Sequence, residues 1–189
     1  MEPIRSVAEL EERLSRPTAG VRETLQAIPG DVLVLGAGGK MGPTLARMVR
    51  RGLEEIGDAG RRVIAVSRFS SRKAAEALQQ SGVETISCDL TDPAAINDLP
   101  DAPNVLYLVG QKFGTGDAPG LTWVTNTVVP ALVAMKFARS RIVALSTGCV
   151  YPLVDAHGPG AGEDDPLDPP GEYANSCVGR ERVFEHYAR

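Results

Sequence analysis

The chain has 189 residues, of which 43% are hydrophobic, and a formal net charge of −4, values typical of a globular protein with one substantial core. The mildly acidic balance gives no basis for binding nucleic acid, and no apolar run approaches the ~20 residues that cross a membrane. His157 and His186 have no companions at metal-ligand spacing, so we expect no metal site. Three widely spaced cysteines and an acidic N-terminus without an apolar leader predict reduced thiols and a cytoplasmic protein.

Residues 1–30 are expected to form an N-terminal helical arm. Residues 6–9 (SVAE) fit a capping box, apolar residues at helical spacing follow, and Pro17 ends the first helix. A second short helix is expected over 21–28. Nothing in this segment has the residues of a chemical site, so we interpret it as a packing arm.

Residues 31–189 are expected to form one domain in which strands and helices alternate. Five apolar runs are continuous rather than alternating, which is typical of strands buried on both faces. The strands are expected at 32–35, 63–66, 83–87, 105–109 and 142–145, and the helices at 41–56, 72–81, 94–99, 121–138 and 171–186. Residues 152–170, rich in Gly, Pro and Asp, are expected to form a surface loop. The pattern predicts an α/β fold, a Rossmann-like, doubly wound parallel sheet of about five strands.

Three glycines, Gly36, Gly39 and Gly42, follow the first strand and open a helix. Glycine permits a tight turn, lets backbone N–H groups approach a pyrophosphate and lets the helix pack closely. A strand before the glycines and a helix after them is the context that a dinucleotide-binding motif requires. We therefore predict a dinucleotide site here, with Lys40 and Met41 beside the glycines.

The end of the second strand indicates which dinucleotide binds. Ser67 stands where an NAD site usually places an acidic residue for the ribose 2′-hydroxyl, and Arg68 follows it. Arg and Ser can bind a 2′-phosphate that an acidic residue would repel. The sequence thus favours NADP and leaves NAD open, and a merely solvated basic loop is the alternative.

From residue 31 onward the chain resembles the extended short-chain dehydrogenase/reductases, the NAD(P)-dependent epimerase/dehydratase family of UDP-glucose 4-epimerase-like proteins. The segments that carry the resemblance are GAGGKMG (36–42), CDLTD (88–92), YLVGQKFG (107–114), LSTGCVYP (145–152) and EDDPLDPPGEY (163–173). The resemblance implies a small-molecule substrate such as a nucleotide sugar, with no nucleic-acid or membrane partner, and leaves a homodimer open. It also implies contacts to the cofactor from Asp89, Leu90, Val109, Gly110, Lys112, Asn126 and Tyr173.

The catalytic helix departs from the family pattern. Thr147 matches the family's catalytic hydroxyl and Tyr173 its catalytic tyrosine, but the lysine of the YxxxK motif is replaced by Cys177. That lysine lowers the pKa of the tyrosine, and moving a phenol from about 10 to about 7 takes roughly 4 kcal/mol, which a neutral thiol does not provide. Lys112 is the predicted compensating cation and is counted with the catalytic residues. The resemblance gives Arg180 no cofactor role, and we interpret it as part of a surface ion pair.

Two functions follow from this departure. The first is an NAD(P)-dependent oxidoreductase, epimerase or dehydratase, and the alternative is a weakened or inactive NADP(H)-binding sensor or partner subunit. A cation beside Tyr173 favours the enzyme, whereas an apolar surrounding favours the alternative. Because the chain stops on the tyrosine helix, we expect the C-terminal substrate-binding part of the family to be absent.

Overall fold

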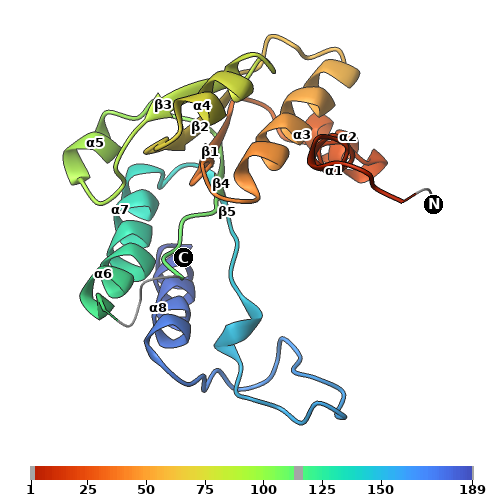
Figure 1. Ribbon diagram of the computed structural model, residues 1–189. Coiled ribbons are helices and arrows are strands. Elements are labelled where there is room, and N and C mark those ends of the chain that lie inside the picture. Colours follow the sequence, from red (N-terminus) through yellow and green to blue (C-terminus); the bar gives the residue numbers. More distant parts are fainter. Residues whose placement is uncertain (1–2, 113–116, 189) are drawn as a thin grey trace. The chain divides into compact units, whose positions relative to one another are not determined.

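The computed structural model describes residues 3–112 and 117–188 (Figure 1). These residues form two compact units: the first contains 3–89, 98–108 and 139–143, and the second contains 90–97, 109–112, 117–138 and 144–188. Phe113 and Gly114, the last residues of the YLVGQKFG segment, lie outside the described residues. No helix in the described ranges is long and apolar enough to cross a membrane.

A five-stranded sheet with the order β3-β2-β1-β4-β5 forms the centre of the first unit. The strands are β1 (Val32–Leu35), β2 (Val63–Ser67), β3 (Glu84–Ser87), β4 (Asn104–Tyr107) and β5 (Arg141–Ala144). β1 pairs in parallel with β2 and β4, and β2 pairs in parallel with β3. The predicted strands are confirmed to within two residues at each end, and the α/β, Rossmann-like fold class is confirmed.

The core of the first unit explains why β1 is continuously apolar. All four of its residues are buried, and Leu33 is fully inaccessible. Val32 and Val34 pack in one cluster with side chains of three helices, α2 (Ala19–Ala27), α3 (Gly42–Glu55) and α4 (Arg72–Gln79), among them Leu53 and Leu78. The prediction of strands buried on both faces is therefore confirmed for β1, whereas the edge strands β3 and β5 contain only exposed and half-buried residues because each has one neighbour in the sheet.

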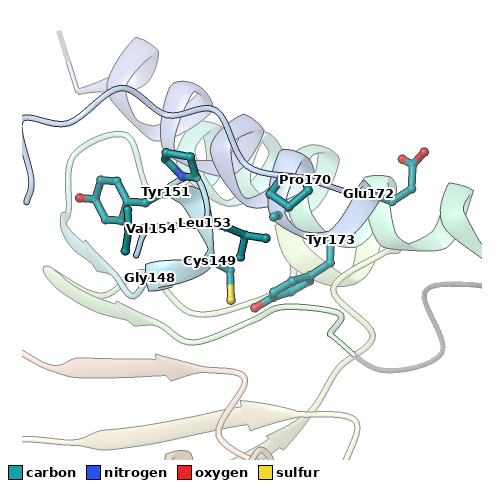
Figure 2. A pocket seen from close by; sticks show the side chains of 11 residues that line it. Gly148, Cys149, Tyr151, Leu153, Val154, Pro170, Glu172 and Tyr173 are labelled. Atoms are coloured by element: carbon teal, nitrogen blue, oxygen red, sulfur yellow. The ribbon is translucent and has the colours of Figure 1, made fainter. Parts of the chain in front are cut away.

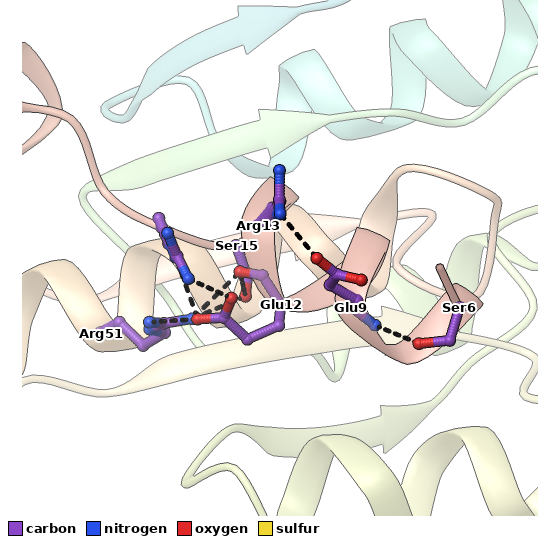
Figure 3. A network of polar contacts seen from close by, with 7 residues as sticks. Ser6, Glu9, Glu12, Arg13, Ser15 and Arg51 are labelled. Atoms are coloured by element: carbon purple, nitrogen blue, oxygen red, sulfur yellow. Dashed lines mark hydrogen bonds and ion pairs between the residues drawn. The ribbon is translucent and has the colours of Figure 1, made fainter. Parts of the chain in front are cut away.

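The N-terminal helix α1 (Val7–Leu14) is attached through charged side chains (Figure 3). The Ser6 hydroxyl accepts a hydrogen bond from the Glu9 backbone N–H at 3.1 Å, which is one half of the predicted capping box. Arg51 of α3 donates to the carboxylate of Glu12 at 3.3 Å and to the hydroxyl of Ser15 at 2.9 Å. Polar contacts therefore join α1 to α3, and no residue of α1 is buried.

The helices of the second unit are α5 (Pro93–Asn97), α6 (Pro119–Trp123), α7 (Val129–Lys136) and α8 (Glu172–Tyr187), with a π-helical turn η1 (Val124–Val128) and a 3₁₀ turn η2 (Gly148–Val150). The helical segment predicted over 121–138 is present within two residues at each end as α6, η1 and α7 in direct succession, with a π-helical turn in its middle that the sequence did not predict. Pro130 has no N–H for the carbonyl of Asn126 and its ring crowds that carbonyl, and a widened turn relieves both problems. The remaining predicted helices agree to within two residues, and 152–170 contains no helix or strand.

Candidate functional site

The glycine turn of the first unit has a geometry that only glycine accommodates. Gly36 has a φ of +83°, and its N–H and that of Ala37 both donate to the carbonyl of Val66 at the end of β2, at 2.9 and 3.1 Å. The Gly39 N–H donates to the Gly36 carbonyl at 3.0 Å. A Cβ on Gly42 would lie 2.3 Å from the carbonyl oxygen of Ala37, so any side chain there would force the turn apart. Glycine thus allows the turn to close tightly on itself, because the backbone occupies the space that a side chain would need.

Ser67 and Arg68 lie at the carboxyl end of β2, next to this turn. A Cβ on Gly38 would lie 2.5 Å from the Ser67 hydroxyl oxygen, so the serine occupies the space that this glycine leaves. The Ser67 carbonyl accepts from the Cys88 N–H at 3.0 Å, and the Arg68 carbonyl accepts from the Ser87 hydroxyl at 3.3 Å. The ends of β1, β2 and β3 are therefore joined in one edge of the sheet, where the sequence placed the adenosine half of a dinucleotide.

Several residues predicted to contact the cofactor are exposed at this edge. They are Lys40, Met41, Arg68 and Asp89. The first turn of α3 has no side-chain cap, so its backbone N–H groups are available to an anion. The strand order reverses at β1, between β2 on one side and β4 on the other, and ligands of such sheets bind at the carboxyl ends of the strands beside this reversal. The edge fits a dinucleotide pyrophosphate.

In the second unit, Asn126 of η1 joins the chain after β4 to α8. Its side chain is fully buried, accepts from the Gln111 N–H at 2.9 Å and donates to the Ser176 hydroxyl at 2.9 Å. The Ser176 hydroxyl in turn donates to the carbonyl of Tyr173 at 2.7 Å. Sequence reasoning placed Asn126 near the cofactor but missed Gln111 and Ser176. The three-residue spacing of Ser176 from Tyr173 was the one signal available for it.

Tyr173 is half-buried in the first turn of α8. Burial raises the pKa of Tyr173 above its ordinary value of 10.0, and neighbouring Cys177 raises it further, whereas a hydrogen bond with Thr147 and the charge of Arg180 lower it. Thr147 also caps η2, because its hydroxyl accepts from the Cys149 N–H at 3.2 Å. Tyr173 in this structure is therefore a neutral phenol at physiological pH.

The ammonium of Lys112 lies over the Tyr173 ring, with Nζ 5.9 Å from the ring centroid. Lys112 is exposed, while Cys177 is fully buried with its sulfur 4.0 Å from the amide nitrogen of Asn126. The structure thus brings together Thr147, Tyr173 and Lys112, the three residues that the sequence proposed as catalytic. Of the other residues predicted to contact the cofactor, Leu90 is buried in the second unit and Val109 is half-buried.

The interpretation of Arg180 as part of a surface ion pair is wrong. Its side chain is only 5% exposed, and Nη1 donates to the carbonyl of Val109 at 3.2 Å. Arg180 follows Cys177 by three residues and therefore shares its buried side of α8. Its neighbour Glu181 instead accepts a hydrogen bond from Ser146, the residue before Thr147.

A surface cavity of about 740 Å³ opens beside Tyr173 (Figure 2). Its lining residues are Gly148, Cys149, Tyr151, Pro152, Leu153, Val154, Pro170, Gly171, Glu172, Tyr173 and Ala174. Figure 2 shows Cys149 of η2 and Tyr173 of α8 projecting in the same direction. The carboxylate of Glu172 accepts from the indole N–H of Trp123, which fixes the start of α8 against α6. The cavity is large enough for a small-molecule ligand. Within the described ranges, no cluster of three or more His, Cys, Asp or Glu residues could hold a metal ion.

The sheet order and the glycine turn together define a Rossmann-like dinucleotide-binding domain. The sequence profile described as the NAD dependent epimerase/dehydratase family matches residues 32–189. The chain therefore belongs to the NAD dependent epimerase/dehydratase family. A comparison with curated protein sequences gives no match.

Solved structures share this fold at low sequence identity. The UDP-Glc/GlcNAc 4-epimerase from Campylobacter jejuni is 19% identical, with a TM-score of 0.70 over 85% of this chain and 49% of its own. The dTDP-glucose 4,6-dehydratase DesIV from Streptomyces venezuelae, solved with NAD and TYD bound, is 20% identical, with a TM-score of 0.70 over 84% of this chain and 52% of its own. A short-chain dehydrogenase/reductase superfamily protein from Agrobacterium tumefaciens with bound NAD is 22% identical, with a TM-score of 0.65 over 84% and 45%. The chain thus spans about half the length of these solved proteins.

Proposed function

We propose that this protein is an NAD(P)-dependent enzyme of the extended short-chain dehydrogenase type, acting as an epimerase, dehydratase or oxidoreductase. The proposed substrate is a nucleotide sugar or a similar small molecule with a hydroxyl or carbonyl group. One observation carries the proposal: the hydroxyls of Thr147 and Tyr173 meet beside a cavity of about 740 Å³, with Lys112 over the phenol ring. Membership of the epimerase/dehydratase family supports the same chemistry.

The proposed cofactor is NADP, with NAD as the second choice. The tight turn at Gly36, Gly39 and Gly42 and the start of α3, which has no side-chain cap, would hold the pyrophosphate, and Ser67 and Arg68 would bind a 2′-phosphate. The other proposed cofactor contacts are Lys40, Met41, Asp89, Leu90, Val109, Gly110, Lys112, Asn126 and Tyr173.

The chain's own residues would hold the substrate and move one proton. Thr147 Oγ1 would hydrogen-bond to the reacting oxygen of the substrate. The neutral phenol of Tyr173 would give its proton to a substrate carbonyl oxygen, and in the reverse direction the phenol would first lose its own proton to solvent and the phenolate would then take the proton of the substrate hydroxyl. Lys112 Nζ would contact the nicotinamide ribose beside the phenol. The cofactor, when bound, supplies or accepts the hydride. Leu153, Val154 and the neighbouring prolines give the cavity an apolar side, and both Leu153 and Val154 are exposed to solvent.

A second candidate is a dinucleotide-binding sensor or partner subunit with little or no turnover. Two observations favour it: Cys177 occupies the position of the family lysine, and burial raises the pKa of Tyr173 when it would have to fall for efficient proton transfer. This candidate shares the cofactor site and differs only in the chemistry at Tyr173.

The two candidates separate in one experiment on the whole protein. NADPH and NADH are titrated by their fluorescence, and turnover is then followed by absorbance against a panel of nucleotide sugars, with Tyr173→Phe as the matched control. Binding with turnover that Tyr173→Phe abolishes supports the enzyme. Binding without turnover across the panel assigns the second candidate, and an absence of binding to either dinucleotide refutes both.

Three further expectations remain proposals. They are a cytoplasmic location, the division into an arm over 1–30 and a domain over 31–189, and a homodimer. Light scattering after size-exclusion chromatography measures the last of these directly, and a monomeric mass at micromolar concentration would contradict it.

A further inference from the structure

The guanidinium of Arg180 is a buried charge that forms no ion pair with a carboxylate of residues 3–112 or 117–188. Its side chain is 5% exposed, and its hydrogen bonding to described residues consists of the bond from Nη1 to the Val109 carbonyl at 3.2 Å. The buried Nε has no hydrogen-bond partner there. Burying a charge with so little compensation costs several kcal/mol, so a tether to one carbonyl is a poor reason to place an arginine here.

The chain makes room for this guanidinium at Gly110. A Cβ on Gly110 would lie 3.1 Å from Nη1 of Arg180, which is closer than most real contacts of a Cβ. Val109 and Gly110 belong to the segment after β4 that is proposed to lie under the cofactor. The charge of Arg180 is therefore held at the wall of the proposed nicotinamide site.

Arg180 also lies on the side of α8 that carries Tyr173. It follows Cys177 by three residues and Tyr173 by seven, and long side chains on a helix lean toward its N-terminus. Its guanidinium therefore leans toward the N-terminal end of α8, and Nη1 reaches the Val109 carbonyl in the same segment that carries Lys112. Consistent with this position, the Arg180 charge lowers the pKa of Tyr173, by less than the hydrogen bond with Thr147 does and against the larger opposing effects of burial and Cys177.

We propose that Arg180 is a positioning residue that supplies, from inside the protein, the fixed positive charge that Cys177 cannot supply to the phenol of Tyr173. This inference rests on the proposed role of Tyr173 in proton transfer. The family lysine is thus replaced by an arginine one helical turn further along the same helix.

The other charged groups near Tyr173 are less suited to this role. Lys112 lies over the ring but is exposed, so water and salt screen its charge. On α8 itself, the carboxylates of Glu172 and Glu181 accept hydrogen bonds from Trp123 and Ser146. Arg180 alone among these groups combines a buried position with a positive charge.

A purely structural role for Arg180 predicts a different result from the proposed one. Arg180→Gln keeps a donor for the Val109 carbonyl but removes the charge, whereas Arg180→Lys keeps the charge. If the charge matters, the Gln variant is defective and the Lys variant is close to wild type. If the tether alone matters, the Gln variant behaves like wild type and the proposal is overturned.

The main readout is the titration of Tyr173, followed by the near-ultraviolet absorbance of phenolate. Subtracting the titration of Tyr173→Phe isolates it from the other tyrosines, and circular dichroism confirms the fold at each pH. We expect Arg180→Gln to raise the pKa of Tyr173 further and Arg180→Lys to leave it near the wild-type value. An unchanged Tyr173 titration in Arg180→Gln would overturn the proposal.

If Arg180→Gln does not fold, the Tyr173 titration can be made on protein that keeps Arg180. The titration is repeated between about 0.05 and 0.5 M salt, because salt screens an exposed charge far more than a buried one. We expect the pKa of Tyr173 to be nearly independent of salt and nearly unchanged in Lys112→Met. A strong salt dependence that Lys112→Met abolishes would assign the charge to Lys112 and refute the role of Arg180.

The last test measures turnover in the single variant and in a double variant. We expect Arg180→Gln to lower kcat by at least about tenfold with little change in NADPH affinity. We expect the double variant, Arg180→Gln with Cys177→Lys, to recover most of the lost kcat. Failure of Cys177→Lys to rescue a folded double variant counts against the proposal. If the wild-type protein neither binds a dinucleotide nor turns over, the proposed function fails, while the phenol titration still decides what Arg180 does.

Discussion

The glycine turn of the first unit and helix α8 of the second unit obey the family pattern to different degrees. The turn keeps glycine wherever a Cβ would collide with backbone, as at Gly42, 2.3 Å from the Ala37 carbonyl oxygen. Helix α8 has lost the lysine of its motif and buries an arginine instead. A position where the backbone leaves no space for a Cβ accepts only glycine, whereas a positive charge near a phenol can come from side chains at more than one position. In the proposed site, cofactor binding would therefore depend on individual glycines, whereas the positive charge beside Tyr173 would depend on the sum of several groups.

The largest effect that this comparison predicts is at Gly42. Gly42→Ala places a Cβ against the backbone of the turn, and we expect it to lower the free energy of unfolding by about 3 kcal/mol and to abolish dinucleotide binding. Urea denaturation and NADPH fluorescence measure the two effects. Gly60→Ala is the matched control, because nothing lies within 4 Å of its Cβ position. Equal stabilities of the two variants would show that the turn tolerates a side chain after all.

The next effect concerns the choice of cofactor. Arg68→Ala should weaken NADPH binding by ~1.5–3 kcal/mol, roughly tenfold to hundredfold, because a charge-assisted contact to the 2′-phosphate is lost. NADH binding should hardly change, since that dinucleotide has no such phosphate. Fluorescence titration of both dinucleotides tests this, with Arg182→Ala as the control for loss of an exposed positive charge. A parallel weakening of NADH binding would assign Arg68 to the shared part of the cofactor.

Each unit contains a buried asparagine whose replacement can be compared with that of the other. Asn104 of β4 donates to the carbonyls of Pro29, Gly30 and Asp31 in the first unit, and Asn126 joins Gln111 to Ser176 in the second. Each replacement by alanine leaves buried partners unsatisfied and should cost about 2 kcal/mol of stability.

Only Asn126→Ala should also reduce turnover, because its partners position Tyr173. Thermal denaturation and initial rates distinguish the two variants. An equal loss of kcat in Asn104→Ala would show that stability, rather than positioning, limits the reaction.

The smallest effect concerns the pH dependence of stability. The hydrogen bonds of Arg62 to Glu84, at 2.9 and 2.8 Å, hold the pKa of Glu84 below its ordinary value of 4.5. A carboxylate with a lowered pKa stabilises the fold above pH 4.5, and this contribution is lost as the pH falls through the folded-state value.

Glu84 is about half exposed, so Glu84→Gln should cost less than about 1 kcal/mol at pH 7 and should flatten the stability curve below pH 4.5. Glu163→Gln in the exposed loop is the control. Unfolding measured from pH 3 to 7 would contradict the expectation if both variants had the slope of the wild type.

The sequence by itself determined the sheet and the glycine turn of this protein. Buried parallel strands need unbroken runs of Val, Ile and Leu, and a pyrophosphate cradle needs glycine at fixed positions, so both appear as local patterns. The resemblance of short segments to the family's motifs also selected Thr147, Tyr173 and Lys112, because each occupies a position that the family's motif defines. Local pattern did not show that a proline at 130 opens a π-helical turn within the predicted helix over 121–138.

The tertiary structure alone decided the surroundings of Tyr173. Asn126, Gln111 and Ser176 come from segments that are far apart in the chain, and nothing in their spacing indicates that they share hydrogen bonds. Sequence reasoning put Arg180 on the surface because charged residues are usually exposed. Its burial depends on which side of α8 faces the segment after β4 and on the space left at Gly110, and packing fixes both. The effect of a charge on Tyr173 depends on its distance in the fold rather than its separation along the chain, so only the structure brings Arg180 into consideration.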